Sequence, residues 1–152
     1  MSDPNKTSGP VIVVGVDGSD PSRDALRWAA GQAEVTGGTL RAIMTWHVPM
    51  INYGAAMPGS IEADVSQDCK EALDQSLAEV LGPSPSVKVV ADVVEGHPGD
   101  VLVRAAEEAE LLVVGSRGHG AFKGMFLGSV SSHCVSHAPC PVVVVRHQSS
   151  DS

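Results

Sequence analysis

Apolar residues along this chain follow two alternating patterns, one typical of buried strands and the other of amphipathic helices. Unbroken apolar runs predict five strands that are covered on both faces, at residues 11–16, 40–46, 87–94, 111–114 and 142–146. Apolar positions that recur every three or four residues predict four helices, at about residues 21–36, 61–80, 99–108 and 129–137. We expect Asp20 to cap the first helix, Pro21 to lie in its first turn and Gly37 to end it.

The alternation of strand and helix predicts the fold class. Crossovers between parallel strands are nearly always right-handed, so this order implies an α/β fold with a parallel sheet and helices on both faces. Sheets of this kind bind ligands beyond the carboxyl ends of their strands, where the winding direction reverses. If the sheet winds outward in both directions from the first strand, residues 15–20 and the segment from 115 onward lie side by side there.

Length and composition limit the class of protein. The 152 residues suffice for one domain, expected at residues 10–147 between polar, disordered tails at 1–9 and 148–152. The net charge of −8 argues against broad nucleic-acid binding. No apolar run approaches the roughly 20 residues that span a bilayer, no secretory signal begins the chain, and the three cysteines form no CxxC pair. We therefore expect a cytoplasmic protein that binds neither nucleic acid nor membranes.

A glycine-rich loop after the fourth strand is the most specific chemical feature. Gly115-Ser116-Arg117-Gly118 follows the strand, and Gly128-Ser129 opens the last helix. Glycines allow close approach of the main chain to a phosphate, while free amides and the helix dipole favour an anion. No Asp or Glu occurs between Leu111 and Ser150, a segment that carries Arg117, Lys123, Arg146 and four histidines. The alternative is an ordinary surface loop.

Several polar side chains are candidates for ligand contact, each with a structural alternative. Asp17, at the end of the first strand, could accept bonds from a ribose hydroxyl or hold a divalent ion, or it could cap the following turn. Ser129 and Ser131 could donate to phosphate oxygens or cap the last helix. Arg117 and Lys123 could clamp phosphates or simply be solvated.

Other site classes are disfavoured. The chain contains no GxxxxGK[ST] loop, and Gly118-His119-Gly120 departs from a dinucleotide fingerprint because its third glycine comes one residue late. No GxSxG elbow or diagnostic Cys–His spacing is present. His133 and His137 could share a zinc ion, but further ligands at suitable positions are lacking.

The last strand, between Val142 and Arg146, should lie at an edge of the sheet. A bare apolar edge invites pairing with another strand, so the sequence favours a two-fold contact with a second copy. Cover by the C-terminal tail is the alternative.

With these residues in hand, the chain closely resembles the universal stress protein family from Val11 to Arg146. The family's ATP-binding pattern, Gly-x2-Gly-x9-Gly-Ser/Thr, is met by Gly115, Gly118, Gly128 and Ser129. The segments 13–19 and 138–145 support the resemblance.

The resemblance implies a Rossmann-like (adenine nucleotide alpha hydrolase-like) three-layer sandwich with five parallel strands in the order 3-2-1-4-5, and a homodimer formed through the last strand. It also implies ATP with Mg²⁺, the ion being held through the nucleotide near Asp17. Thr45 would border the adenine, Asp17 the ribose, and the glycine loops the ribose and phosphates. The residues implied in nucleotide binding are Gly15, Val16, Asp17, Thr45, Val114, Gly115, Ser116, Arg117, Gly118, Gly128, Ser129, Val130 and Ser131.

The function implied is that of an ATP-binding, nucleotide-responsive regulator of the stress response with an unknown protein partner and slow or no hydrolysis. A slow ATPase or phosphotransferase is one alternative, although no gripping lysine or positioned base is visible. An interaction module that binds another adenylate, such as cyclic AMP, is the other.

Overall fold

The computed structural model describes residues 9–47, 59–118 and 127–147. The expected disordered tails at 1–9 and 148–152 lie outside the described residues except for Gly9, and so does the candidate phosphate clamp Lys123. No helix in the described segments has both the length and the apolar character needed to cross a bilayer.

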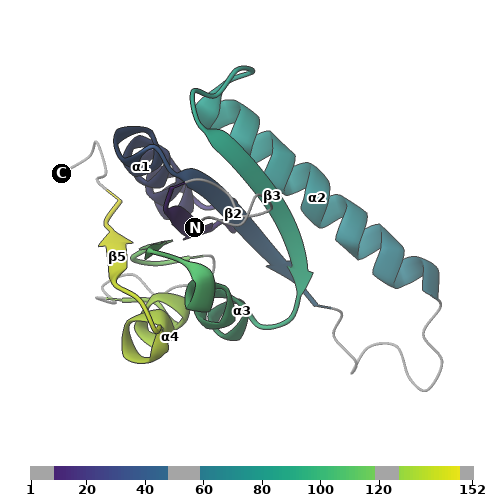
Figure 1. Ribbon diagram of the computed structural model, residues 1–152. Coiled ribbons are helices and arrows are strands. Elements are labelled where there is room, and N and C mark those ends of the chain that lie inside the picture. Colours follow the sequence, from purple (N-terminus) through teal and green to yellow (C-terminus); the bar gives the residue numbers. More distant parts are fainter. Residues whose placement is uncertain (1–8, 48–58, 119–126, 148–152) are drawn as a thin grey trace, which may run out of the picture.

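Five parallel strands form one sheet in the order β3-β2-β1-β4-β5, which confirms the predicted fold class and strand order (Figure 1). The strands are β1 (Val11–Gly15), β2 (Thr39–Trp46), β3 (Lys88–Glu95), β4 (Leu111–Gly115) and β5 (Val142–Val145). The central strand β1 pairs with β2 on one side and β4 on the other. The winding direction therefore reverses at β1, and the carboxyl ends of β1 and β4 are neighbours.

Four helices connect the strands, namely α1 (Asp20–Thr36), α2 (Gly59–Leu81), α3 (Pro98–Ala105) and α4 (Ser129–His137). The third predicted helix is divided, because its last turn tightens into the 3₁₀ helix η2 (Ala106–Glu108) before the chain becomes extended at Ala109. Such tightening is common at helix C-termini.

The N-cap of α1 is Ser19, so the prediction of Asp20 was wrong by one residue. Ser19 has extended backbone angles, and its Oγ accepts a hydrogen bond from the amide of Ser22 at 3.3 Å. Asp20 is instead the first helical residue, where its charge complements the helix dipole. The helix ends as predicted at Gly37, whose φ of 70° is left-handed.

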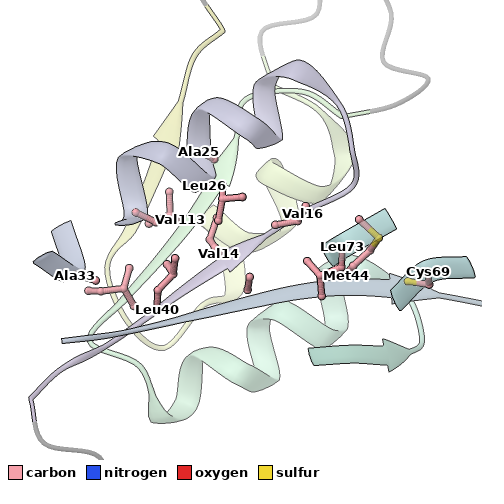
Figure 2. Packing of buried hydrophobic residues seen from close by; sticks show 13 residues of the cluster. Val14, Val16, Ala25, Leu26, Ala33, Leu40, Met44, Cys69, Leu73 and Val113 are labelled. Atoms are coloured by element: carbon pink, nitrogen blue, oxygen red, sulfur yellow. The ribbon is translucent and has the colours of Figure 1, made fainter. Parts of the chain in front are cut away.

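The sheet separates two apolar clusters. One lies beneath α1 and α2, where Val14 and Leu26 meet near Val113 and Leu73 enters from α2 (Figure 2). The other lies beneath α3 and α4 and includes Cys134. A fully buried Leu or Val side chain stabilises the fold by about 1.5–3 kcal/mol, so both faces of the sheet hold their helices firmly.

Close packing of α1 against the end of β4 predicts that Gly115→Ala destabilises the fold. A Cβ at Gly115 would lie 2.8 Å from the main-chain carbon of Pro21, and backbone cannot move aside as a flexible side chain can. We expect the free energy of unfolding to fall by about 1–3 kcal/mol, as measured by urea denaturation.

Gly31→Ala in the exposed middle of α1 is the matched control. A Cβ there meets nothing within 4 Å, so the helix should gain about 0.5–1 kcal/mol. Equal effects of the two substitutions would contradict the packing argument.

Candidate functional site

A pocket of about 400 Å³ opens at the carboxyl edge of the sheet, where the chain leaves β1 and β4. All the site residues expected from the sequence line it, except Ser116. Four residues that sequence reasoning missed complete the lining: Ser22, Ile43, Pro98 and Leu102. The two glycine-containing segments are therefore brought together as the winding of the sheet requires.

Ser116 lies behind the pocket wall and joins three elements. Its side chain is buried, its amide donates to the carbonyl of Val145 at 2.8 Å, and its carbonyl accepts from the amide of Gly128 at 2.7 Å. The hydroxyl of Ser131 donates to the same carbonyl at 2.9 Å. These bonds fix the start of α4 against the end of β4.

Two glycines at this junction lie close to atoms of neighbouring segments. A Cβ at Gly128 would lie 3.3 Å from the Cα of Arg117, and a Cβ at Gly118 would lie 2.5 Å from Oδ2 of Asp17. A side chain at either position would enter space that the neighbouring loop already fills. The two glycines therefore permit a compact cradle.

The first turn of α4 supplies hydrogen-bond donors. Its N-cap, Gly128, has no side chain to accept from the first amides, and the first intrahelical bond runs from Ser132 to the Gly128 carbonyl. The amides of Ser129, Val130 and Ser131 precede that bond and lack an acceptor within the helix. Because the single hydrogen of the Ser131 hydroxyl is already shared between the carbonyls of Ser116 and Gly128, a bond donated to a ligand would come from the main chain of Ser131. Such a turn favours an anion.

Part of the pocket lining is apolar. Ile43 of β2 and Val114 of β4 line it from the sheet, while Pro98 and Leu102 line it from α3. Leu102 covers Gly15, since its Cδ1 would lie 2.7 Å from a Cβ at that position. The strand order could have indicated that α3 contributes to the pocket, because this helix starts just after β3, and β3 ends at the same edge of the sheet.

Asp17 has a local structural role. Its Oδ1 accepts from the amide of Ser19 at 2.9 Å and from the Ser19 hydroxyl at 2.5 Å, which shapes the turn before α1. Asp17 therefore caps the turn that follows it, which was the structural alternative to ligand contact, and its side chain also lines the pocket. No group of three His, Cys, Asp or Glu side chains suited to a metal ion occurs among the described residues. A divalent ion here would need oxygens from a ligand beside this carboxylate.

The two histidines of α4 do not converge on a metal position. Their rings stack with centroids 4.4 Å apart, His133 Nε2 lies 3.2 Å from Oδ1 of Asp100, and His137 Nδ1 contacts the carbonyl of His133 at 3.1 Å. Cys134 between them is fully buried, and burial raises the pKa of its thiol to about 11. That thiol is therefore a core group.

Solved structures share this architecture. Universal stress protein UspA from Lactobacillus plantarum superposes with a TM-score of 0.71 at 24% identity, over 90% of this chain and 97% of that one. A universal stress protein solved in complex with cAMP has a TM-score of 0.70 at 26% identity, over 93% and 100% of the two chains.

Curated relatives are longer. A universal stress protein of Mycolicibacterium smegmatis is 37% identical over 136 residues, which are 89% of this chain and 45% of the relative. Universal stress protein Rv2005c of Mycobacterium tuberculosis is 36% identical over 143 residues, 94% of this chain and 47% of the relative. The chain thus spans about half the length of these relatives.

The family comparison matches nearly the whole folded region, residues 10–146, to the model of the universal stress protein family. Strand order, the glycine pattern and the relatives agree with this match. The chain belongs to the universal stress protein family.

Proposed function

We propose that this protein is a cytoplasmic, nucleotide-responsive regulator of the stress response that binds ATP with Mg²⁺ in the pocket between β1 and β4. The observation that carries the proposal is the first turn of α4, whose amides have no acceptor within the helix and whose residues line the pocket together with Gly118 and Gly128. Main-chain donors of this kind suit phosphate oxygens. The family match and the cAMP complex of a relative 26% identical support an adenylate as ligand.

The polarity of the pocket sets the direction of the nucleotide. The adenine lies at the apolar end, between Ile43 and Leu102 and beside Thr45. The phosphates lie at the amide end beside Gly128 and Ser129, and the ribose lies between them near Asp17. A nucleotide bound in the opposite direction would have its charged phosphates against apolar side chains, which costs desolvation energy with no compensating hydrogen bonds.

Magnesium fits this arrangement as a companion of the phosphates. Mg²⁺ usually keeps several waters and is bound through one or two carboxylates together with substrate phosphates. Asp17 is the carboxylate of the pocket lining. It would hold the ion through the nucleotide, so the bound ion would screen the phosphates from this carboxylate.

The pocket lining favours binding over rapid turnover. Among the described residues that line it, there is no lysine or histidine, and Arg117 is the single cation. Phosphoryl transfer needs positioned charge and an oriented nucleophile. We propose slow or no hydrolysis. The relative solved with cAMP favours one specific alternative, in which the physiological ligand is another adenylate.

Adenine nucleotides should raise the Tm of the wild-type protein, and Gly118→Ala should reduce this shift. At a free nucleotide concentration 100 times Kd, binding adds about 2.7 kcal/mol to the free energy of unfolding. The Cβ at Gly118 displaces Asp17 and narrows the cradle. The measurement is a thermal-shift series with Mg-ATP, ADP, AMP and cAMP.

Gly31→Ala, which adds a methyl group in open space far from the pocket lining, serves as control and should keep the wild-type shifts. If no adenylate shifts the Tm of the wild-type protein, the proposed function is wrong. A larger shift with cAMP than with ATP would favour the alternative ligand.

We further propose that the protein is a homodimer through the strand from Val142 to Arg146. Within the described residues, β5 pairs with β4 alone. The carbonyls of Pro141 and Val145 accept from β4, so by strand alternation the amide and carbonyl of Val144 face the open edge. An open, entirely apolar edge strand is a template for pairing with a second copy.

Val144→Pro should convert this dimer to a monomer, because proline removes the amide at the open edge but no bond to β4. The mass in solution, from size-exclusion chromatography with light scattering, measures the change. Val144→Ala, which loses side-chain volume but keeps the amide, should remain dimeric. A dimeric Val144→Pro protein would exclude edge pairing through β5.

A further inference from the structure

The helices α3 and α4 lie side by side and together form one side of the pocket (Figure 1). Pro98 and Leu102 line it from α3, and Ser129 and Val130 line it from α4. The separation of the two helices is therefore also a dimension of the pocket. Nucleotides that share a ribose and its phosphates differ only in the base, so a residue that fixes this separation determines how large a base can enter.

Gly99 of α3 and His133 of α4 are in close contact at the junction of the two helices. A Cβ at Gly99 would lie 2.8 Å from Cδ2 and 3.1 Å from Cγ of the His133 ring, distances at which a neighbour has to move. Glycine is among the poorest helix formers, yet Gly99 is the second residue of α3. The missing side chain lets the two helices approach more closely than any other residue at this position would allow.

The His133 ring has little room to turn away from Gly99. It stacks on the His137 ring, with centroids 4.4 Å apart and planes inclined by 24°. Its Nε2 lies 3.2 Å from Oδ1 of Asp100, and the next residue along α4, Cys134, is fully buried. The ring is thus flanked by side chains of both helices. A group added at Gly99 would therefore push the first turn of α3 away from α4.

This contact adjoins the pocket lining on both helices. Pro98 directly precedes Gly99 in α3, and Leu102 follows one turn after Pro98. Val130 lies about one turn before His133 in α4. A displacement of the first turn of α3 would therefore change the width of the pocket between Pro98 and Val130.

We infer that Gly99 and His133 are positioning residues, which set the separation of α3 and α4 and thereby limit the size of the base that the pocket accepts. The inference rests on the proposed function, because it concerns the base of the nucleotide in the same pocket. Neither residue belongs to the pocket lining, so both act through Pro98 and Val130. The ligand class favoured is a nucleotide with an unmodified purine, since a base with an added ring would require α3 to move.

Calorimetric titration of the full chain with Mg-ATP and with Mg-etheno-ATP tests this inference. Etheno-ATP has the same ribose and phosphates, but a third ring is fused to its adenine. The wild type should prefer ATP about tenfold, the lower end of what an apolar pocket achieves against one added carbon. Gly99→Ala should lower this preference to about twofold, because a wider pocket admits the larger base. Etheno-ATP also lacks the amino hydrogens of adenine, but this difference is the same for every variant.

A double variant tests whether the effect depends on the His133 ring. In Gly99→Ala/His133→Ala the added methyl group occupies part of the space that the ring leaves, so the preference for ATP should return toward the wild-type value. Such non-additive behaviour is typical of residues in contact. A merely structural loss of stability would instead weaken both ligands in proportion and leave their ratio unchanged.

Gly31→Ala, the same substitution in a helix where a Cβ meets nothing within 4 Å, is the matched control and should keep the wild-type ratio. Circular dichroism establishes that each variant is folded. If Gly99→Ala does not fold, His133→Ala, which removes the support of α3 from the α4 side, should lower the preference in its place.

Two kinds of failure are distinguishable. If the wild type binds neither nucleotide, the proposed function and this inference both fail. If the wild type binds ATP but has no preference over etheno-ATP, or if the preference is unchanged in Gly99→Ala or not recovered in the double variant, the inference alone is overturned.

Discussion

The carbonyl oxygen of Ser116 is the junction on which the pocket depends. It accepts hydrogen bonds from the Gly128 amide and the Ser131 hydroxyl, while the amide of the same residue donates to Val145 of β5. Ser116 is only 5% exposed, and bonds of this kind gain strength where water is excluded. Through them the first turn of α4 has a defined position relative to β4. The amides of this turn are therefore in position before a ligand binds. Binding does not have to order a loop, so the conformational entropy cost of ordering one is avoided.

Close approach explains why this junction needs glycines. Gly115 lies against the main chain of Pro21, and Gly118 lies against the carboxylate of Asp17. Each contact joins the end of β4 or the loop after it to the chain that follows β1, and the reversal of winding makes these two segments neighbours. The parallel sheet thus places both segments at its carboxyl edge, and the glycines, which have no side chain, allow them to come close together.

Much of this architecture is predictable from the sequence because its signals are local. Continuous apolar strands and helical spacing determine the elements, and the family resemblance, which the family match confirms, supplies the strand order. The choice between Ser19 and Asp20 as N-cap was missed, since adjacent capping residues differ only in backbone angles. The pocket roles of Pro98 and Leu102 were missed because α3 reads as an ordinary amphipathic helix. The glycine pattern also does not distinguish Ser116, which is buried behind the pocket lining, from its neighbours, which line the pocket.

Net charge is a poor guide to what such a protein binds. The chain carries −8, yet α2 alone has six carboxylates against one lysine, and it covers the face of the sheet opposite α4 (Figure 1). The sheet separates these charges from the α4 amides, and salt screens exposed charges beyond about 8 Å. The end of a helix, by contrast, presents about half a positive charge in direct contact with a ligand. The field at an anion beside Ser129 is therefore set mainly by groups of the pocket lining, where the nearest amides and Arg117 attract the anion and the Asp17 carboxylate opposes them. An acidic protein can thus offer a phosphate site.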